Sequence, residues 1–388
     1  MTVASQRGRL AKVHLSGTHR VCPPEQTWRR VRQTFSRVGV TRVADVTGLD
    51  DIGIPVFQAV RPDAYSVSVS QGKGLTPVLA KVSAAMESVE LWHAEHLTSD
   101  IGEVMVGDVA NALGYRLDEL AVAPRSFLNP GLRLAWSTAR RLTDGGSSLV
   151  PTALIHVDRR AGAAWAPRLF VTTSNGLASG NTVEEATLHG LCEVVERDAW
   201  ARAKAAPLVG LDLSSVDGPA GVLLELFRSA QVEVHVRVLP SPVGLPCFRA
   251  LITSETFPVA HFGMGAHTDR DVSLCRALTE AAQSRLTSIA GSRDDIAGKE
   301  YEQVESIIRG RARRPDLSRL RESAGVVSFA ELASVANPDL GEDLRIVVER
   351  VREHTGRDPL VVDHTREDLG IPVVHVICPG LRHEHHAT

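Results

Sequence analysis

Two acidic stretches of the sequence decide the fold and the site that it carries. They are residues 77–95, PVLAKVSAAMESVELWHAE, and residues 180–200, GNTVEEATLHGLCEVVERDAW. In both stretches apolar residues recur about every three to four positions, which is the spacing of a helix with one buried face. We predict one helix over residues 76–97 and a second helix over residues 182–205.

The first predicted helix presents its acidic residues on one face. Ser83, Glu87 and Glu90 stand at positions i, i+4 and i+7. At the rotation of an α-helix, their side chains fall within an arc of about 60°. The apolar residues between them give the same helix a second face that can pack against a core.

The second predicted helix carries a matching stripe. Glu185, Glu193 and Glu196 stand at positions i, i+8 and i+11, and their side chains fall within an arc of about 80°. Asn181 lies one turn ahead, at the edge of the same stripe. The chain therefore offers two polar faces, each rich in carboxylates.

Glutamates on a helix are most often solvated and paired with Lys or Arg one turn away. Here the basic residues within reach are few: Lys81 is hardly on the first face, and Arg197 is adjacent to Glu196. Clustered carboxylates repel one another unless a cation neutralises them. Magnesium prefers such oxygen ligands and commonly arrives with the phosphates of a nucleotide, so we predict a nucleotide and magnesium site.

The loops before the two helices fit this prediction. Residues 70–77, SQGKGLTP, and residues 173–182, TSNGLASGNT, place flexible backbone N–H groups beside a helix N-terminus, where anions bind. Taken alone, a glycine-rich turn before a helix is more often a simple connection. Neither loop matches the P-loop or the dinucleotide-binding fingerprint.

The rest of the chain alternates between helix and strand patterns, which predicts an α/β or α+β fold with mixed sheets. Residues 295–343 are rich in charge with weak patterns, and we expect a surface insertion there. The other predicted helices cover residues 24–39 and 274–291, and the predicted strands cover residues 65–70, 149–157, 232–239, 246–253, 359–365 and 371–380.

Composition excludes several classes of protein. The 388 residues carry a net charge of −3, without the strongly basic balance of a protein that mainly binds nucleic acid. No apolar run approaches the roughly 18 residues of a membrane span, and the first residues lack the apolar core of a signal peptide. The five cysteines are scattered, with no CxxC pair. We expect a cytoplasmic protein without membrane or nucleic-acid partners.

Five ordered segments resemble the YcaO superfamily and run from Gly17 to Gly380. They are GTHR (17–20), TGLDDIGIPVFQAVRP (47–62), GKGLTPVLAKVSAAMESVE (72–90), SNGLASGNTVEEATLHGLCEVVERDAW (174–200) and IPVVHVICPG (371–380). The resemblance implies a YcaO-type fold, with mixed sheets and helices around a nucleotide site between interleaved subdomains. It also implies ATP-dependent phosphorylation of a backbone amide oxygen in a ribosomally made peptide. The attacking nucleophile would then yield an azoline, a thioamide or an amidine.

The same resemblance assigns roles to residues of this chain. Glu87, Glu90, Glu193 and Glu196 are expected to hold Mg²⁺ around the triphosphate of ATP. Arg197 is expected to contact phosphate. Further nucleotide contacts are expected from Ser83, Asn181, Glu185, Arg20, Thr27 and Arg285, with Arg293 as an additional candidate for phosphate. No catalytic residue is assigned.

The resemblance also sets the expected domain organisation and partners. We expect an N-terminal extension over residues 1–16, one catalytic domain over residues 17–380 and a flexible His-rich tail over residues 381–388. The short extension leaves no room for a fused leader-binding domain, so a separate leader-binding or TfuA-like partner is expected beside the precursor peptide. A homodimer is a further expectation.

Two departures from the family pattern bear on the chemistry. Leu91 stands where an arginine often follows the second glutamate of the first helix. The chain ends CPGLRHEHHAT, without the proline-rich PxPxP tail that is common in azoline-forming members. The products left open are therefore a thioamide, an amidine, or an azoline formed without that tail.

Several residues and functions also allow other interpretations. Cys192 is expected to be a packed thiol because Leu191 and Val195 flank it, and His189 is expected to pack rather than to carry protons. A scaffold that presents a substrate to a partner, and an ATP-dependent ligase or kinase for a small molecule, are the alternative functions.

Overall fold

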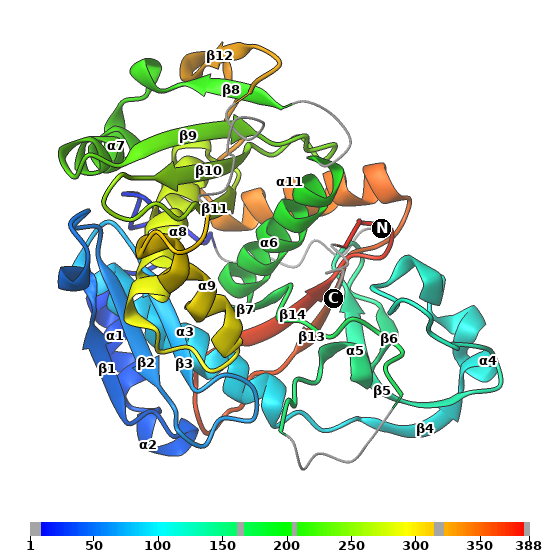
Figure 1. Ribbon diagram of the computed structural model, residues 1–388. Helices are drawn as coiled ribbons and strands as arrows, with labels where there is room; N and C mark the ends of the chain where they lie inside the picture. The colour runs from blue at the N-terminus through cyan, green and yellow to red at the C-terminus, as the bar shows by residue number, and fades with distance from the viewer. Residues whose placement is uncertain (1–8, 161–166, 204–207, 314–321, 384–388) are drawn as a thin grey trace.

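The computed structural model describes residues 9–160, 167–203, 208–313 and 322–383, and it contains three β-sheets, each covered by one long helix (Figure 1). The mixed α/β architecture predicted from the sequence is confirmed. The first eight residues of the predicted extension and residues 384–388 of the predicted tail lie outside the described residues. Among the described residues, no helix is long and apolar enough to cross a membrane.

The first sheet is antiparallel, in the order β1-β2-β3. Helix α3 packs on β2 and β3, and α1 packs on α3. Helix α3 begins at Pro77, where proline fits the first turn, and the Thr76 hydroxyl accepts a hydrogen bond from the N–H of Leu79. The elements are α1 (Pro24–Arg32), α2 (Phe35–Val38), β1 (Arg42–Asp45), β2 (Val56–Val60), β3 (Val69–Lys73) and α3 (Pro77–Glu95).

The second sheet has the order β11-β10-β9-β8-β12, and only its β8–β12 pair is parallel within the described chain. Helix α8 packs on β10 and β11, and α7 packs on α8. Asp269 caps the start of α8, and Gly291, with φ of 59°, ends it. The elements are β8 (Val209–Asp212), α7 (Gly218–Ser229), β9 (Glu233–Val238), β10 (Cys247–Thr253), β11 (His261–Ala266), α8 (Arg270–Ala290), α9 (Gly298–Ile308) and β12 (Val326–Ser328).

The third sheet has the order β4-β5-β13-β14-β7, with β6 paired to β5, and all of these pairs are antiparallel. Helix α6 packs on β7 and β14, and α11 packs on α6. The elements are β4 (Ile101–Met105), α4 (Val106–Val109), β5 (Arg133–Arg141), β6 (Ser147–Pro151), α5 (Thr152–Ile155), β7 (Leu177–Ser179), α6 (Val183–Ala203), α11 (Leu340–Thr355), β13 (Leu360–Asp363) and β14 (Val373–Ile377).

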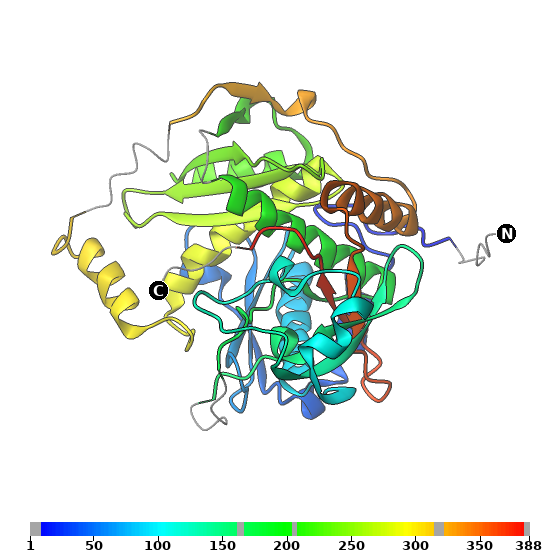
Figure 2. The same ribbon diagram turned by 90° about the vertical axis from the view of Figure 1, so that its right-hand side faces the viewer.

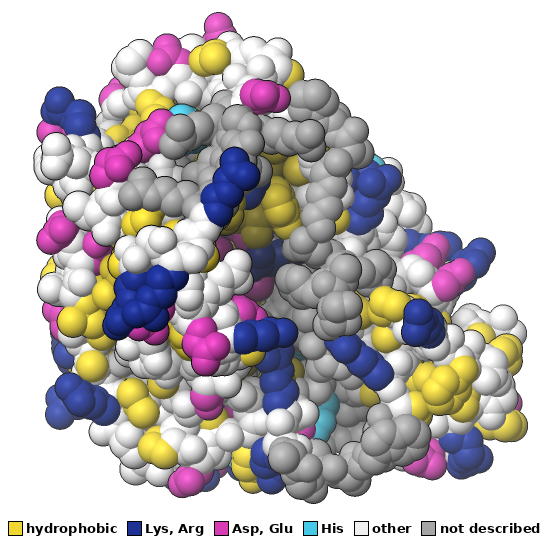
Figure 3. Space-filling view, in the orientation of Figure 1, with side chains coloured by type: hydrophobic (Ala, Val, Ile, Leu, Met, Phe, Trp, Pro, Cys, Tyr) yellow, Lys and Arg dark blue, Asp and Glu magenta, His cyan; other side chains and the backbone are white. Residues whose placement is uncertain are grey.

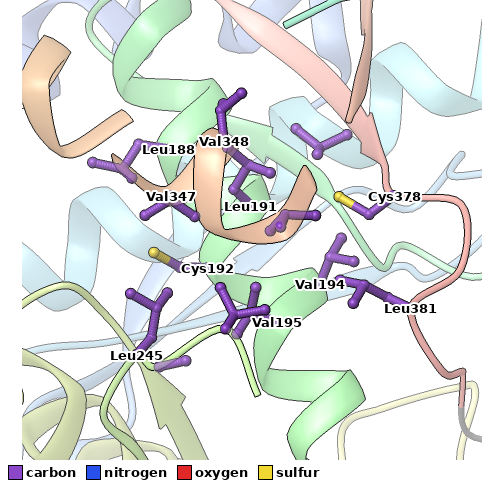
Figure 4. Close-up of a cluster of buried hydrophobic side chains, with 14 of the residues drawn as sticks. Leu188, Leu191, Cys192, Val194, Val195, Leu245, Val347, Val348, Cys378 and Leu381 are labelled. Atoms are coloured by element: carbon purple, nitrogen blue, oxygen red, sulfur yellow. The ribbon is translucent and has the colours of Figure 1, made fainter. Parts of the chain in front are cut away.

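Helix α6 lies at the centre of the molecule and is buried on most sides. Figure 4 shows Leu188, Leu191 and Val195 of this helix among apolar side chains of α11 and of the segment after β14. Leu191 and Val195 have no exposed surface. These apolar contacts cover one part of the surface of α6, while Glu185, Glu193 and Glu196 lie along another.

Several predicted elements differ in detail from the structure. The strand predicted over residues 65–70 begins only at Val69, and the strand predicted over residues 149–157 ends at Pro151, where α5 follows. The charged stretch 295–343 contains helix α9 and the short strand β12. These differences arise where short apolar runs fit either a helix or a strand.

Glycines bring each sheet into direct contact with its helix. A Cβ atom on Gly263 of β11 would stand 2.2 Å from the N atom of Ala281 in α8. A Cβ on Gly72 of β3 would stand 1.9 Å from the N atom of Ala84 in α3, and a Cβ on Gly190 of α6 would stand 2.7 Å from the oxygen of Gly176. The backbones therefore touch, which fixes how far each helix stands from its sheet.

We predict that Gly263→Ala destabilises the protein by about 1–3 kcal/mol, because the added methyl group must push α8 away from β11. The matched control is Gly102→Ala in β4, where an added Cβ meets nothing within 4 Å. That control should change the unfolding free energy by less than about 0.5 kcal/mol. Urea unfolding measures both values, and equal effects of the two substitutions would contradict the close-packing argument.

Candidate functional site

Helices α3, α6 and α8 enclose a cavity of about 360 Å³ between the three sheets. This volume is in the range of a small-molecule site, about 300–1,000 Å³. On the face of the molecule shown in Figure 3, basic and acidic side chains are interspersed, without an extended field of one charge among the residues described there. The cavity is lined by nearly all of the predicted site residues: Arg20, Thr27, Ser83, Glu87, Glu90, Asn181, Glu185, Glu193, Glu196 and Arg197.

The carboxylates of α3 are held by backbone groups of neighbouring strands. Glu87 accepts a hydrogen bond from the N–H of Gln71 at 3.0 Å. Glu90 accepts two hydrogen bonds from Ser179, from its N–H at 2.8 Å and from its hydroxyl at 2.6 Å. Burial raises the pKa of Glu87, and it raises the pKa of Glu90 to about 8. Both side chains are therefore oriented but not neutralised by a cation of their own.

Glu185 joins the start of α6 to the N-terminal segment. One oxygen of Glu185 accepts from the N–H of Val21 at 2.9 Å, and the other accepts from the side chain of Asn181 at 2.8 Å. The guanidinium of Arg20 lies 3.7 Å from Glu185, and the hydroxyl of Thr27 donates to Asn181 at 2.8 Å. The structure thus brings together four predicted residues that are far apart in the sequence.

Glu193 and Glu196 face the same cavity from further along α6. Burial raises the pKa of Glu193 to about 7, and burial also raises the pKa of Glu196. The nearest ion-pair distance to Glu196 is 3.8 Å, from Arg197. A positive charge brought into the cavity would therefore stabilise the ionised form of both glutamates.

Helix α8 contributes two charged residues that the sequence analysis missed. Arg276 lies 2.6 Å from the Nε2 atom of His189, and Glu280 forms an ion pair of 2.8 Å with Lys73. The two residues are one helical turn apart, at positions i and i+4. This spacing, which places both on one face of α8, is the signal in the sequence that could have identified them. Arg276 and Lys73 supply cations that neither acidic helix carries.

Arg285, also on α8, lies outside the lining of the cavity. Its guanidinium binds Asp50 at 2.9 Å and Ser254 at 2.9 Å, and its side chain is 4% exposed. Arg293 forms an ion pair with Asp295, although its charge acts on Glu87. Arg276 of α8 lines the cavity. Arg285, about two and a half turns further along the same helix, does not.

Cys192 is packed among apolar side chains, as the sequence analysis expects (Figure 4). The residue is 1% exposed, and burial raises the pKa of its thiol to about 12. His189, in contrast, lines the cavity beside Arg276. Burial lowers the pKa of His189 well below its usual value, so the ring is neutral at physiological pH.

The lining residues fit a nucleotide with magnesium. The buried atoms Nε2 of Gln71 and Nδ1 of His189 have no hydrogen-bond partner among the described residues, and both side chains line the cavity. No three His, Cys, Asp or Glu side chains in the described parts of the chain form a group that could hold a metal ion by themselves. Magnesium suits this arrangement because it is commonly bound through one or two carboxylates and the phosphates of its nucleotide.

We predict a pH-dependent stability for the protein without ligands. In the unfolded chain Glu193 ionises near its ordinary pKa of 4.5, but in the folded protein it ionises near pH 7. The stability contributed by the protonated side chain is therefore complete below about pH 4.5 and is lost as the pH rises through about 7. Glu193→Gln should leave the unfolding free energy almost unchanged near pH 4 and raise it by about 2–4 kcal/mol near pH 8. Urea unfolding at both pH values measures this, and a difference that does not vary with pH would contradict it.

Comparisons with known proteins point to one family. A family model described as YcaO cyclodehydratase, ATP- and Mg²⁺-binding, matches residues 71–382. An uncharacterized protein of Mycobacterium tuberculosis is 37% identical over 95% of this chain and 83% of its own length. An uncharacterized protein in the tfuA 3′ region of Rhizobium leguminosarum bv. trifolii is 33% identical over 93% of this chain and 88% of its own.

A solved structure resembles the whole described fold. It is YcaO from Methanopyrus kandleri bound with AMPPCP and Mg²⁺, with a TM-score of 0.74 and 27% sequence identity. The match covers 96% of this chain and 94% of that chain. The fold expected from the five sequence segments is thereby confirmed.

Proposed function

This chain belongs to the YcaO family of cyclodehydratases, whose cofactors are ATP and Mg²⁺, and we propose that it phosphorylates a backbone amide of a ribosomally synthesised peptide. One observation carries the proposal. Glutamates from two helices, with pKa values raised by burial, face one cavity together with Arg276 and Lys73. Such a site is suited to a ligand that combines anionic phosphates with a divalent cation.

Magnesium ions would be bound by the glutamates of α3 and α6 together with the phosphates of the nucleotide, each ion through one or two carboxylates. Glu90 is oriented by Ser179 and Glu87 by the N–H of Gln71, so their oxygens are fixed before the metal arrives. Glu193 and Glu196 approach from the opposite helix. Bound magnesium supplies charge neutralisation for the transferred phosphoryl group, which is the main requirement of phosphoryl transfer.

The cationic side chains would bind the phosphates. Arg20 enters from the N-terminal segment, Arg197 from α6 and Arg276 from α8, so the three come from different parts of the fold. The cavity is also lined by Ser83, Asn181, Glu185 and Thr27. Hydrogen bonds among the last three fix the shape of one end of the cavity. When the phosphates and the amide are held in one fixed relative geometry, the activation barrier of phosphoryl transfer is lower.

Phosphorylation solves the chemical problem of the amide. An amide carbon is a poor electrophile and its oxygen is a poor leaving group. Once the oxygen is bonded to phosphorus, a nucleophile can add to the carbon, and the oxygen leaves as phosphate. The amide oxygen therefore ends in the phosphate, and the nucleophile takes its place on the carbon.

A thioamide is the product that we favour. The Rhizobium relative, 33% identical, comes from a tfuA region, which supports a TfuA-like partner for this chain. In that reaction a sulfide donor adds to the activated amide, and sulfur replaces the oxygen. A separate partner protein would deliver the sulfide, and the precursor peptide would be the substrate.

The fate of the amide oxygen tests the proposal. Candidate precursor peptides, from short reading frames beside the gene, can be synthesised with heavy oxygen in their backbone carbonyls. Incubated with the protein, a TfuA-like partner, sulfide, ATP and Mg²⁺, they should release phosphate that contains the heavy isotope and gain one sulfur in place of one oxygen. Mass spectrometry measures both changes. A sulfur-containing product with unlabelled phosphate would contradict amide phosphorylation, and labelled phosphate with a ring product would contradict the thioamide.

A further inference from the structure

A buried ion pair lies behind the nucleotide cavity. The ammonium of Lys12 is 2.5 Å from the carboxylate of Asp343, and the two side chains are 1% and 0% exposed. Lys12 lies in the segment before GTHR that the sequence analysis treats as an extension, and Asp343 lies in the first turn of α11. Figure 2 shows this N-terminal segment running beside α11.

Asp343 also accepts hydrogen bonds from two further residues. Its Oδ2 atom also accepts from the hydroxyl of Thr268 at 2.7 Å, and its Oδ1 atom accepts from the N–H of Asn337 at 2.6 Å. Thr268 directly precedes the cap of α8, the helix that carries Arg276. Asp343 therefore joins the N-terminal segment, α11 and the start of α8 at one point.

Lys12 also contacts the loop that lines the cavity. Its ammonium lies 3.0 Å from the Nδ1 atom of His19. Lysine can only donate, so Nδ1 of His19 accepts and the ring proton is on Nε2. His19 stands between Thr18 and Arg20, both of which line the cavity, and its ring packs edge-on against His267 at 5.0 Å.

The loop itself is closed by backbone hydrogen bonds. The N–H of Arg20 donates to the oxygen of His14 at 3.0 Å, and the N–H of Val13 donates to the oxygen of Arg20 at 2.9 Å. Gly17 allows the tight turn, with φ of 69°, against the side chain of Leu75. The loop is thus a narrow hairpin with the buried side chain of Lys12 at its base.

We propose that the Lys12–Asp343 pair is a positioning device, which holds the hairpin Val13–Arg20 so that Arg20 faces the phosphates of the nucleotide. A buried ion pair is a poor way to gain stability, because apolar residues of similar volume often serve as well or better. The directional hydrogen bonds of this ion pair do, however, fix the relative positions of the groups that they join. This inference rests on the proposed nucleotide site, and it assigns a role to residues that do not touch that site.

The test is a double-mutant cycle read by the binding of AMPPCP with Mg²⁺ in calorimetry. Lys12→Met should raise the Kd about tenfold or more, since displacement of a binding group by about 1 Å is costly. In an Arg20→Gln background the same substitution should change the Kd little, because the group that it positions is absent. The matched control is Arg9→Met, on the same segment, where the arginine is 72% exposed and lies 3.9 Å from Asp339. That control should leave the Kd unchanged.

A second readout needs no ligand. Amide hydrogen exchange of the free protein should become faster in the hairpin with Lys12→Met than with Arg9→Met, while exchange in the core of α6 stays slow. If Lys12→Met does not fold, His19→Leu keeps the ion pair and removes only its link to the hairpin, and the same changes are expected.

The outcomes separate the inference from the proposed function. Equal Kd values for the wild type and Lys12→Met, or equal losses with and without Arg20, would overturn the positioning role. Absence of binding in the folded wild type would instead overturn the nucleotide site itself.

Discussion

The burial of four carboxylates in one cavity, which disfavours their ionised forms, is the dominant constraint on this structure. Glu87 and Glu90 from α3 face Glu193 and Glu196 from α6, and burial raises the pKa of each. A fold that served stability alone would place these side chains in water. In the function that we propose, a cation bound among them offsets the cost of burying them.

The architecture keeps these repelling groups at fixed positions. Each of the three helices lies directly on the backbone of its own sheet, through Gly72, Gly263 and the contact of Gly190 with Gly176. A helix seated in this way cannot shift to relieve repulsion. Behind the cavity, the Lys12–Asp343 ion pair likewise holds the N-terminal hairpin in a fixed position. The site is therefore preorganised by packing on one side and by a buried polar network on the other.

Much of this could be predicted from the sequence, because helical spacing alone places Glu87 beside Glu90 and Glu193 beside Glu196. Ordered motifs extended the prediction to Arg20 and Thr27. The pairing of α8 with the cavity could not be predicted in this way. Arg276 and Arg285 stand on the same helix, and only the packing of α8 on β11 decides that the first lines the cavity while the second binds Asp50. The cations that balance the glutamates, Lys73 and Arg276, likewise meet them only in the folded chain.

Calorimetry with ATP and Mg²⁺ tests the central claim most directly, that two acidic helices form one nucleotide site. We expect magnesium-dependent binding in the wild type and a Kd about tenfold or more higher in both Glu87→Gln and Glu193→Gln, since each substitution removes a charge that the metal requires. Glu184→Gln is the matched control, because Glu184 lies on α6 but not in the lining of this cavity. Undiminished binding in either of the first two variants, or equal loss in the control, would contradict the account.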